Sequence, residues 1–239
     1  MLIEKTIFDL RQNSDQKLFA AFDADGTLWD TDLGENFFQY QIEHKHIPLP
    51  TEPYQEYLDK KIINNDPRSA YVWLAEINDG QSIEQVRSWA DKAFLEIVPK
   101  PIFSEQKKLI DLFLKNNIEI FIVTASIKWA VEPGARALGL KNENVIGVET
   151  EIANGTVTKK PVLPITYRQG KIEALLKHTN GIYPFFASGN SSGDIELLES
   201  ATHIKLAVSA ASRDEKLFKS EKELTDIAIE KKWLTHRFI

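Results

Sequence analysis

Two aspartates, two positions apart, end a short apolar run near the N-terminus. The run reads KLFAAF, and Asp23 and Asp25 follow it, with Gly26 and Thr27 closing the turn. One such carboxylate can attack phosphorus, and a second can move a proton. Because a carboxylate and a phosphate ester repel each other, this chemistry also needs Mg²⁺ and a lysine to cancel the repulsion. The pair therefore predicts a site that handles a cation, a phosphate group, or both.

Three further stretches carry the other groups that this chemistry needs. VTAS ends an apolar run and brings the hydroxyl of Thr124 and the backbone amide of Ala125. Lys171 lies near the start of a predicted helix, and SGNSSGD adds the amide of Asn190 and the carboxylate of Asp194. Positioned donors of this kind hold the charge that spreads over a phosphoryl group during its transfer. Together the stretches match the needs of phosphoryl transfer through an aspartyl-phosphate.

The elements that must position these residues follow from hydrophobic periodicity. Strands are predicted at 17–22, 118–126, 182–188 and 202–208. Helices are predicted at 104–116, 127–138, 170–178 and 193–199, and at the C-terminus. Two alternating runs within 145–163 meet at Asn154-Gly155, which predicts a β-hairpin.

Strands that alternate with helices predict an α/β fold, with a Rossmann-like parallel sheet core and helices on both faces. Ligands of such sheets bind at the carboxyl ends of the strands. Each of the four stretches follows a predicted strand or opens a helix on that edge, so we expect them to meet at one site.

Residues 34–97 show a different pattern. Their apolar residues have helical spacing, no β-like run occurs, and prolines at 48, 50, 53 and 67 separate the groups. We expect an all-helical insertion over 34–97, and a core domain formed by 1–33 and 98–239.

Composition limits the classes of function. The 239 residues are 43% hydrophobic with a formal charge of −6, which predicts a folded globule and does not favour a nucleic-acid partner. The absence of cysteine excludes disulfides and thiolate chemistry. The N-terminal stretch is too polar for a secretory signal, and no apolar run approaches the ~18 residues of a membrane span. We expect a cytoplasmic protein without a membrane partner, either a monomer or a homodimer.

In all four stretches and in their order, the chain resembles the haloacid dehalogenase superfamily of phosphohydrolases. DADGT matches the Asp-x-Asp-x-Thr motif, Thr124 the second motif, Lys171 the third, and GNSSGD looks like the acidic fourth. The resemblance covers about 17–30 and 100–235. The insertion matches the family's C1 cap in position. The hairpin before the lysine makes the chain look most like the phosphoserine-phosphatase-like branch.

The resemblance implies a role for each matching residue. Asp23 would be the nucleophile and a Mg²⁺ ligand. Asp25 would protonate the leaving oxygen and then accept a proton from the attacking water, and its backbone carbonyl would bind the metal. Thr124 and Ala125 would hold the phosphate, and Lys171 would pair with Asp23 and the phosphate.

The fourth motif departs from the family pattern. Asn190 stands where an aspartate usually binds Mg²⁺ directly, although hard cations also accept amide oxygens. Asn190 and Asp194 would both lie on the metal side, and which of them is the direct ligand stays open.

The substrate is less well defined. Asp32 lies about where phosphoserine phosphatases place a substrate-contacting glutamate, with Glu35 beside it; a charge at a cap hinge is the alternative interpretation. Four aromatic residues either line a pocket or pack in the core: Trp29, Tyr71, Trp73 and Trp89.

The resemblance implies a Mg²⁺-dependent phosphatase that hydrolyses a small phosphate monoester, a phosphorylated metabolite, through an aspartyl-phosphate. One alternative is a phosphotransferase or mutase of the same family, in which a substrate hydroxyl replaces the water. Another is a non-catalytic protein that captures a phosphorylated ligand. A dehalogenase is disfavoured, because displacement of a halide needs no leaving-group proton and Asp25 would be idle.

Overall fold

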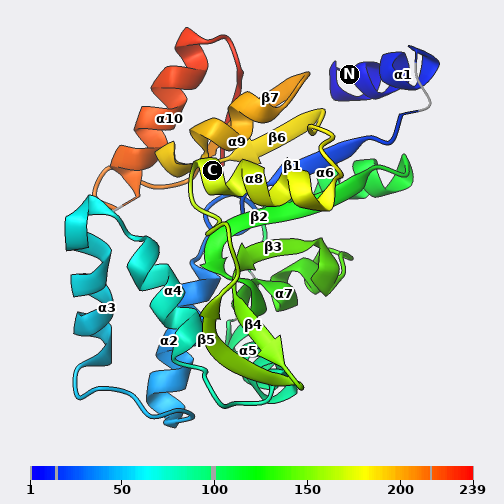
Figure 1. Cartoon of the computed structure of the whole chain (residues 1–239). Helices are drawn as coiled ribbons and strands as arrows, with labels where there is room; N and C mark the ends of the chain where they lie inside the picture. The colour runs from blue at the N-terminus through cyan, green and yellow to red at the C-terminus, as the bar shows by residue number, and fades with distance from the viewer. Residues whose placement is uncertain (1, 14–15, 98–100, 216, 239) are drawn as a thin grey trace.

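A six-stranded parallel sheet forms the centre of the computed structural model, which describes residues 2–13, 16–97, 101–215 and 217–238 (Figure 1). Its strand order is β3-β2-β1-β6-β7-β8. The strands are β1 Phe19–Phe22, β2 Glu119–Ile127, β3 Val145–Val148, β6 Phe186–Gly189, β7 Ile204–Ser209 and β8 Leu234–Arg237. The chain adds strands on one side of β1 and then on the other, so the order reverses at β1, where such sheets bind ligands.

Helices cover both faces of the sheet, which confirms the predicted Rossmann-like α/β class. One face carries α1 Leu2–Asn13, α6 Ser104–Lys115 and α7 Lys128–Ala137; the other carries α8 Gln169–His178 and α9 Ile195–Ser200, and α10 Phe218–Glu230 packs near β7. Side chains of β1 alternate between the faces: Phe22 joins Phe113 of α6, while Ala21 joins Leu175 of α8. Because both faces are buried, β1 is a continuous apolar run.

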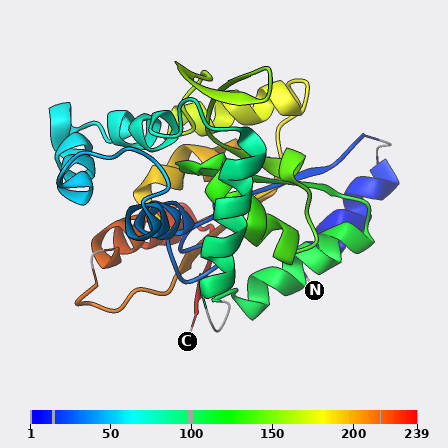
Figure 2. The same cartoon turned by 90° about the horizontal axis from the view of Figure 1, so that it is seen from below.

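The insertion, residues 34–97, is helical where predicted. It contains α2 Leu33–His44, α3 Pro53–Ile62, a 3₁₀ turn Ile63–Asn65, α4 Arg68–Glu76 and α5 Ile83–Glu96. Phe38, Leu74 and Val86 form its apolar core together with Trp129 of α7. In the view from below, the green-cyan helix α5 lies beside the green core helices (Figure 2). The insertion therefore shares its core with α7.

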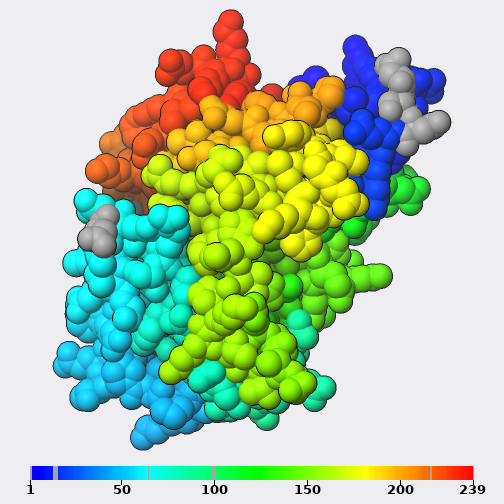
Figure 3. Space-filling model, viewed as in Figure 1, coloured from blue at the N-terminus to red at the C-terminus, as the bar shows by residue number. Residues whose placement is uncertain are grey.

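The hairpin is confirmed at Asn154-Gly155. Strands β4 Thr150–Ala153 and β5 Thr156–Pro161 pair antiparallel, and both turn residues have positive φ, 50° and 78°, as a type I′ turn requires. The first half of the predicted hairpin region, 145–148, is instead β3 of the main sheet. The yellow-green hairpin region lies beside the cyan insertion in Figure 3. Backbone bonds join them, including Val157 N to Gln81 O at 2.9 Å.

Three elements differ from expectation. Helix α1 and strand β8 were not predicted, because α1 buries only Ile7 in the core and β8, LTHR, is a largely exposed edge strand without an apolar run. Strand β6 begins at Phe186 rather than 182, after a segment that contains Pro184, which lacks the N–H of a ladder bond.

No helix in the described part of the chain is long and apolar enough to cross a membrane.

Candidate active site

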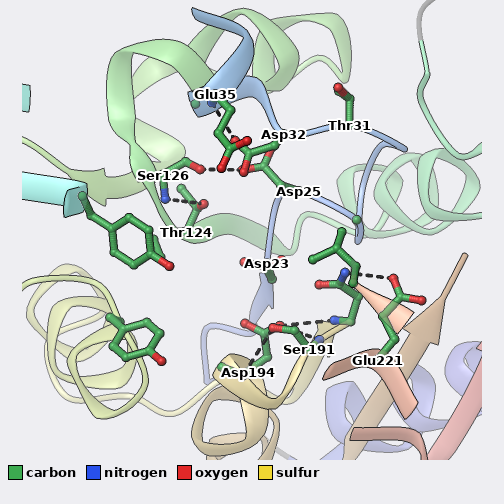
Figure 4. Close-up of a pocket in the computed structure, with 18 of the residues that line it drawn as sticks. Asp23, Asp25, Thr31, Asp32, Glu35, Thr124, Ser126, Ser191, Asp194 and Glu221 are labelled. Carbon is green, nitrogen blue, oxygen red and sulfur yellow. Dashed lines mark hydrogen bonds between the residues drawn. The ribbon is translucent and has the colours of Figure 1, made fainter. Parts of the chain in front are cut away.

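One pocket of about 270 Å³ collects the residues that the sequence singled out (Figure 4). It lies at the carboxyl ends of β1, β2 and β6 and at the start of α8. Its lining includes Asp23, Asp25, Asp32, Thr124, Ala125, Lys171, Asn190 and Asp194. The four stretches meet because parallel strands end at the same sheet edge.

Asp23 is buried directly after β1 and is held at both oxygens. Its Oδ1 accepts from Lys171 Nζ at 2.6 Å, and its Oδ2 accepts from Thr27 Oγ1 at 3.1 Å. Burial and the nearby Asp194 carboxylate raise the pKa of Asp23 to about 6, although Lys171 opposes the shift. The carboxylate therefore has a fixed orientation and one cationic partner at the pocket floor.

Lys171 connects two buried carboxylates. Burial lowers the pKa of its ammonium, but Asp194 and Asp23 raise it by more, so the pKa lies above its ordinary value and the group stays charged. The other oxygen of Asp194 accepts from Asn190 N at 3.2 Å and from Ser191 N and Oγ at 3.0 Å. Both oxygens of Asp194 thus have protein donors, and this residue anchors the loop after β6.

Asp25 is surrounded by three donors. Its Oδ1 accepts from Trp29 Nε1 at 2.7 Å and from Leu33 N at 2.9 Å. Its Oδ2 accepts from Ser126 Oγ at 2.6 Å, a contact drawn in Figure 4. Burial, and then repulsion from Asp32, raise the pKa of Asp25 to about 8. The raised pKa favours the protonated carboxyl more than in a free aspartate, as the role of a general acid requires.

Thr124 and Ser126 come from the end of β2. Thr124 is buried, and its Oγ1 accepts from Ser126 N at 3.1 Å. Ser126 was not singled out in the sequence, although it belongs to the VTAS stretch. Its contact with Asp25 spans 101 residues, so no local sequence pattern predicts it.

Acidic residues also line the entrance of the pocket. Asp32 is the N-cap of α2 and accepts from Glu35 N at 2.8 Å. Burial and the Glu35 carboxylate raise the pKa of Asp32 above its ordinary value. Glu35 in turn accepts from Lys61 Nζ at 2.6 Å and from Tyr57 Oη at 3.2 Å, both on α3. An ion pair thus joins α2 to α3 beside the pocket.

The four aromatic residues named from the sequence do not gather around one point. Trp29 is buried and donates to Asp25, while Trp73 and Trp89 pack with the insertion core. Tyr71 does line the pocket, and the aromatic rings beside it are those of Tyr57 and Tyr167. Of the four, only Tyr71 lines this pocket, and Trp29, Trp73 and Trp89 pack in the core.

Asn190 is buried between β1 and α10. Its Oδ1 accepts from Thr27 Oγ1 at 3.3 Å, and its Nδ2 donates to Glu221 Oε1 at 3.2 Å. Gly26 has φ of +75°, and a Cβ there would lie 2.0 Å from Asn190 Nδ2. Only glycine therefore lets the first motif approach the fourth. Sequence analysis did not identify Glu221, because KSEKELTD carries no motif.

The oxygen donors of the site fit Mg²⁺. In the described ranges no group of three His, Cys, Asp or Glu side chains forms a metal cluster. Asp23 Oδ2 and Asn190 Oδ1 nevertheless converge, because Thr27 Oγ1 lies 3.1 Å from one and 3.3 Å from the other. With the backbone carbonyl expected from Asp25, this is an all-oxygen set, and Mg²⁺ is bound by few protein ligands and several waters.

Known proteins resemble the chain at low identity. A phosphorylcholine phosphatase of Pseudomonas aeruginosa is 22% identical over 184 residues, 61% of this chain and 52% of that protein. The chain thus spans about half the length of this curated relative. A structure of unknown function from Bordetella pertussis Tohama I has a TM-score of 0.73 at 17% identity, covering 92% and 99% of the two chains.

A phosphoserine phosphatase solved as a phospho-aspartyl intermediate analogue has a TM-score of 0.53 at 12% identity, covering 93% of this chain and 94% of that one. At these identities the structural likenesses show a shared fold. The family model described as haloacid dehalogenase-like hydrolase matches residues 20–199, from the first motif to beyond the fourth. This match covers well over half of the chain, and it confirms that the protein belongs to the haloacid dehalogenase-like hydrolases.

Proposed function

We propose that the protein is a Mg²⁺-dependent phosphatase that hydrolyses a small phosphate monoester through an aspartyl-phosphate on Asp23. One observation carries the proposal: Asp23 is buried, held by Lys171 and Thr27, in the same pocket as Asp25, whose pKa is raised by burial. Residues that only stabilised the fold would not need to combine a buried nucleophile, a buried cation and a proton donor in one pocket.

The side chains support two successive displacements. Asp23 attacks phosphorus, a bond forms between its oxygen and phosphorus, and the ester bond breaks as Asp25 gives its proton to the leaving oxygen. Asp25, now a carboxylate, takes a proton from water as that water attacks phosphorus and releases Asp23 and inorganic phosphate. Thr124 and the Ala125 amide bind phosphate oxygens, and Lys171 offsets their charge.

Three oxygen-bearing groups of the pocket would bind the metal in this proposal. Asp23, the Asp25 carbonyl and Asn190 would hold Mg²⁺, which supplies positive charge beside the phosphate oxygens. Asn190 Oδ1 shares the Thr27 hydroxyl with Asp23 Oδ2, whereas Asp194 accepts from Lys171 and from its own loop, so in this proposal Asp194 is a partner of Lys171. We therefore propose Asn190, rather than Asp194, as the direct ligand.

The pocket favours a small leaving group with positive charge. Its volume of about 270 Å³ limits size, and Asp32 and three tyrosines line it. Carboxylates and aromatic faces both attract cations. Lys61 already lies over the rings of Tyr57 and Tyr71, which leaves Asp32 and Tyr167 as the groups for a substrate cation. Relatives named for phosphorylcholine and phosphoserine agree with this class, since both compounds carry a cationic nitrogen.

Turnover of p-nitrophenyl phosphate, with Mg²⁺ and with EDTA, tests the activity. We expect Mg²⁺-dependent release of nitrophenol and its loss in Asp23→Asn, because an amide cannot form the acyl phosphate. Retention of a tenth of wild-type activity would refute Asp23 as nucleophile. Binding without turnover would favour the ligand-capturing protein, and transfer to an added alcohol would favour the phosphotransferase.

Phosphate release from phosphorylcholine, phosphoserine and glycerol phosphate tests the substrate class. We expect higher kcat/KM for the two cationic esters than for glycerol phosphate, and a selective loss of this preference in Asp32→Asn. Equal kcat/KM for all three esters would refute a role of Asp32 in recognition.

A further inference from the structure

Glu221 is a buried carboxylate in the first turn of α10 that lines the pocket. Its Oε2 accepts from the backbone amides of Ala210 at 3.0 Å and Ala211 at 2.9 Å, in the segment after β7. Its Oε1 accepts from Asn190 Nδ2 at 3.2 Å. Glu221 is labelled in Figure 4. Three N–H donors thus fix this carboxylate in place.

No ion pair involving Glu221 occurs within the described ranges of the chain. A buried carboxylate is costly without a compensating positive charge, even when it is hydrogen-bonded. The side chain that donates to it is the amide of Asn190, whose oxygen accepts from Thr27, which also donates to Asp23. A cation held by that amide oxygen would provide the missing compensation.

The hydrogen bond also sets the orientation of the Asn190 amide. A carboxylate can only accept, so Asn190 must turn its NH₂ toward Glu221 and its oxygen toward Thr27. An amide turned the other way would present two N–H groups to the Asp23 side and could not bind a cation. Glu221 therefore decides which end of the amide faces the nucleophile.

We propose that Glu221 is a positioning residue that, paired with Asn190, replaces the aspartate expected in the fourth motif. Asn190 supplies the coordinating oxygen, and Glu221 supplies the orientation and the negative charge behind it. The inference rests on the proposed function, because it assigns the pair to the Mg²⁺ site. It also explains the asparagine: an aspartate in its place would put two carboxylates at the 3.2 Å separation of the present hydrogen bond.

Mg²⁺ binding to the metal-free protein without substrate, measured by calorimetry, is the direct test. We expect Glu221→Gln to weaken binding at least tenfold, because the introduced glutamine must keep its oxygen on the two backbone amides and would then face Asn190 with its own NH₂. The matched control is Glu223→Gln, an exposed carboxylate on the same helix, which should change the Kd less than twofold.

A double variant that exchanges the amide and the carboxylate of the pair completes a double-mutant cycle. In Asn190→Asp with Glu221→Gln, the introduced glutamine amide donates to the introduced aspartate, whose second oxygen faces Asp23. We expect this double variant to bind Mg²⁺ within threefold of wild type. In the metal-free protein, Asn190→Asp alone should lower Tm, and adding Glu221→Gln should raise it again, because the second change removes the repulsion.

The outcomes separate the two proposals. If the wild type binds Mg²⁺ and hydrolyses p-nitrophenyl phosphate but Glu221→Gln binds Mg²⁺ equally well, the inference on Glu221 is wrong and the proposed function stands. The inference is also wrong if the double variant binds no better than Glu221→Gln. A wild type that neither binds Mg²⁺ nor turns over would overturn the proposed function and this inference together.

Discussion

At the scale of single residues, Asp25 shows how burial raises the pKa of a carboxyl group. Trp29, Leu33 and Ser126 donate to its carboxylate, yet burial and Asp32 outweigh them and raise its pKa to about 8. The same environment that favours the protonated form costs stability at neutral pH, because the folded protein opposes ionisation of the group.

Asp25→Asn should therefore stabilise the metal-free protein, and increasingly so as pH rises. The folded pKa of Asp25 is raised, so its contribution to stability is present below the unfolded value near 3.8 and is lost as pH rises toward 8. Asparagine does not titrate, and its NH₂ can donate to Ser126. Thermal unfolding in EDTA at pH 5 and pH 8 checks this: a Tm difference between variant and wild type that does not grow with pH would contradict it.

Gly26 provides a second test at this scale. Gly26→Ala should destabilise the protein and weaken Mg²⁺ binding, because the new Cβ would meet Asn190 Nδ2. Gly155→Ala is the matched control: it has a similar positive φ, but no atom lies within 4 Å of its Cβ. We expect the control to lose ~1 kcal/mol from backbone strain alone, and Gly26→Ala to lose more by chemical denaturation. Equal losses would show that Asn190 moves aside freely.

At the scale of elements, α5 is fastened to α7 by a buried charge. Glu132 of α7 is fully buried and accepts from Arg87 of α5 at 2.7 and 2.8 Å, with Arg87 partly exposed. Together with the backbone bonds between the hairpin and residues 80–83, this pair attaches one side of the insertion to the core.

Arg87→Met should destabilise the protein by ~3–5 kcal/mol, because it leaves the Glu132 carboxylate buried and unpaired. The double variant Arg87→Met with Glu132→Gln should recover a large part of that loss. Arg68→Met is the control: its pair with Asp66 is exposed, and exposed pairs contribute about 0–1 kcal/mol. Urea denaturation of the variants is the measurement, and a loss for Arg87→Met no larger than that of the control would contradict the argument.

At the scale of the whole molecule, the insertion has two unequal halves. Helix α5 is fastened to α7 and the hairpin, whereas α3 buries only Tyr57 and has connecting segments on both sides. Tyr57 and Lys61 of α3 and Tyr71 of α4 line the pocket. Helix α4 packs in the shared core through Ala70 and Leu74, so closure over a substrate should involve residues 53–62 more than 68–76 or 83–96.

Hydrogen–deuterium exchange with beryllium fluoride and Mg²⁺, which mimic an aspartyl-phosphate, tests this division. We expect slower exchange over 53–62 on binding and little change over 83–96. Asp23→Asn is the control, because it lacks the carboxylate that binds the mimic. Equal slowing in both halves would show that the insertion closes as one body.

The sequence alone determined the features that depend on local order. The apolar run before Asp23, the Asn154-Gly155 turn and the alternation of strands and helices are local signals, so the sheet, the hairpin turn and the common edge were predictable. The four motifs also follow one another along the chain, and each comes at the end of a strand or the start of a helix. The family membership was predictable for the same reason.

Only the tertiary structure decided which distant side chains meet. Strand β8 pairs with β7 at the sheet edge without an apolar pattern of its own, and the first half of the predicted hairpin region joined the main sheet as β3. Ser126 reaches Asp25 across 101 residues, and Glu221 reaches Asn190 across 31. Such contacts depend on how helices and loops pack against the sheet, and an isolated serine or glutamate in a polar segment has no periodicity that encodes its partner.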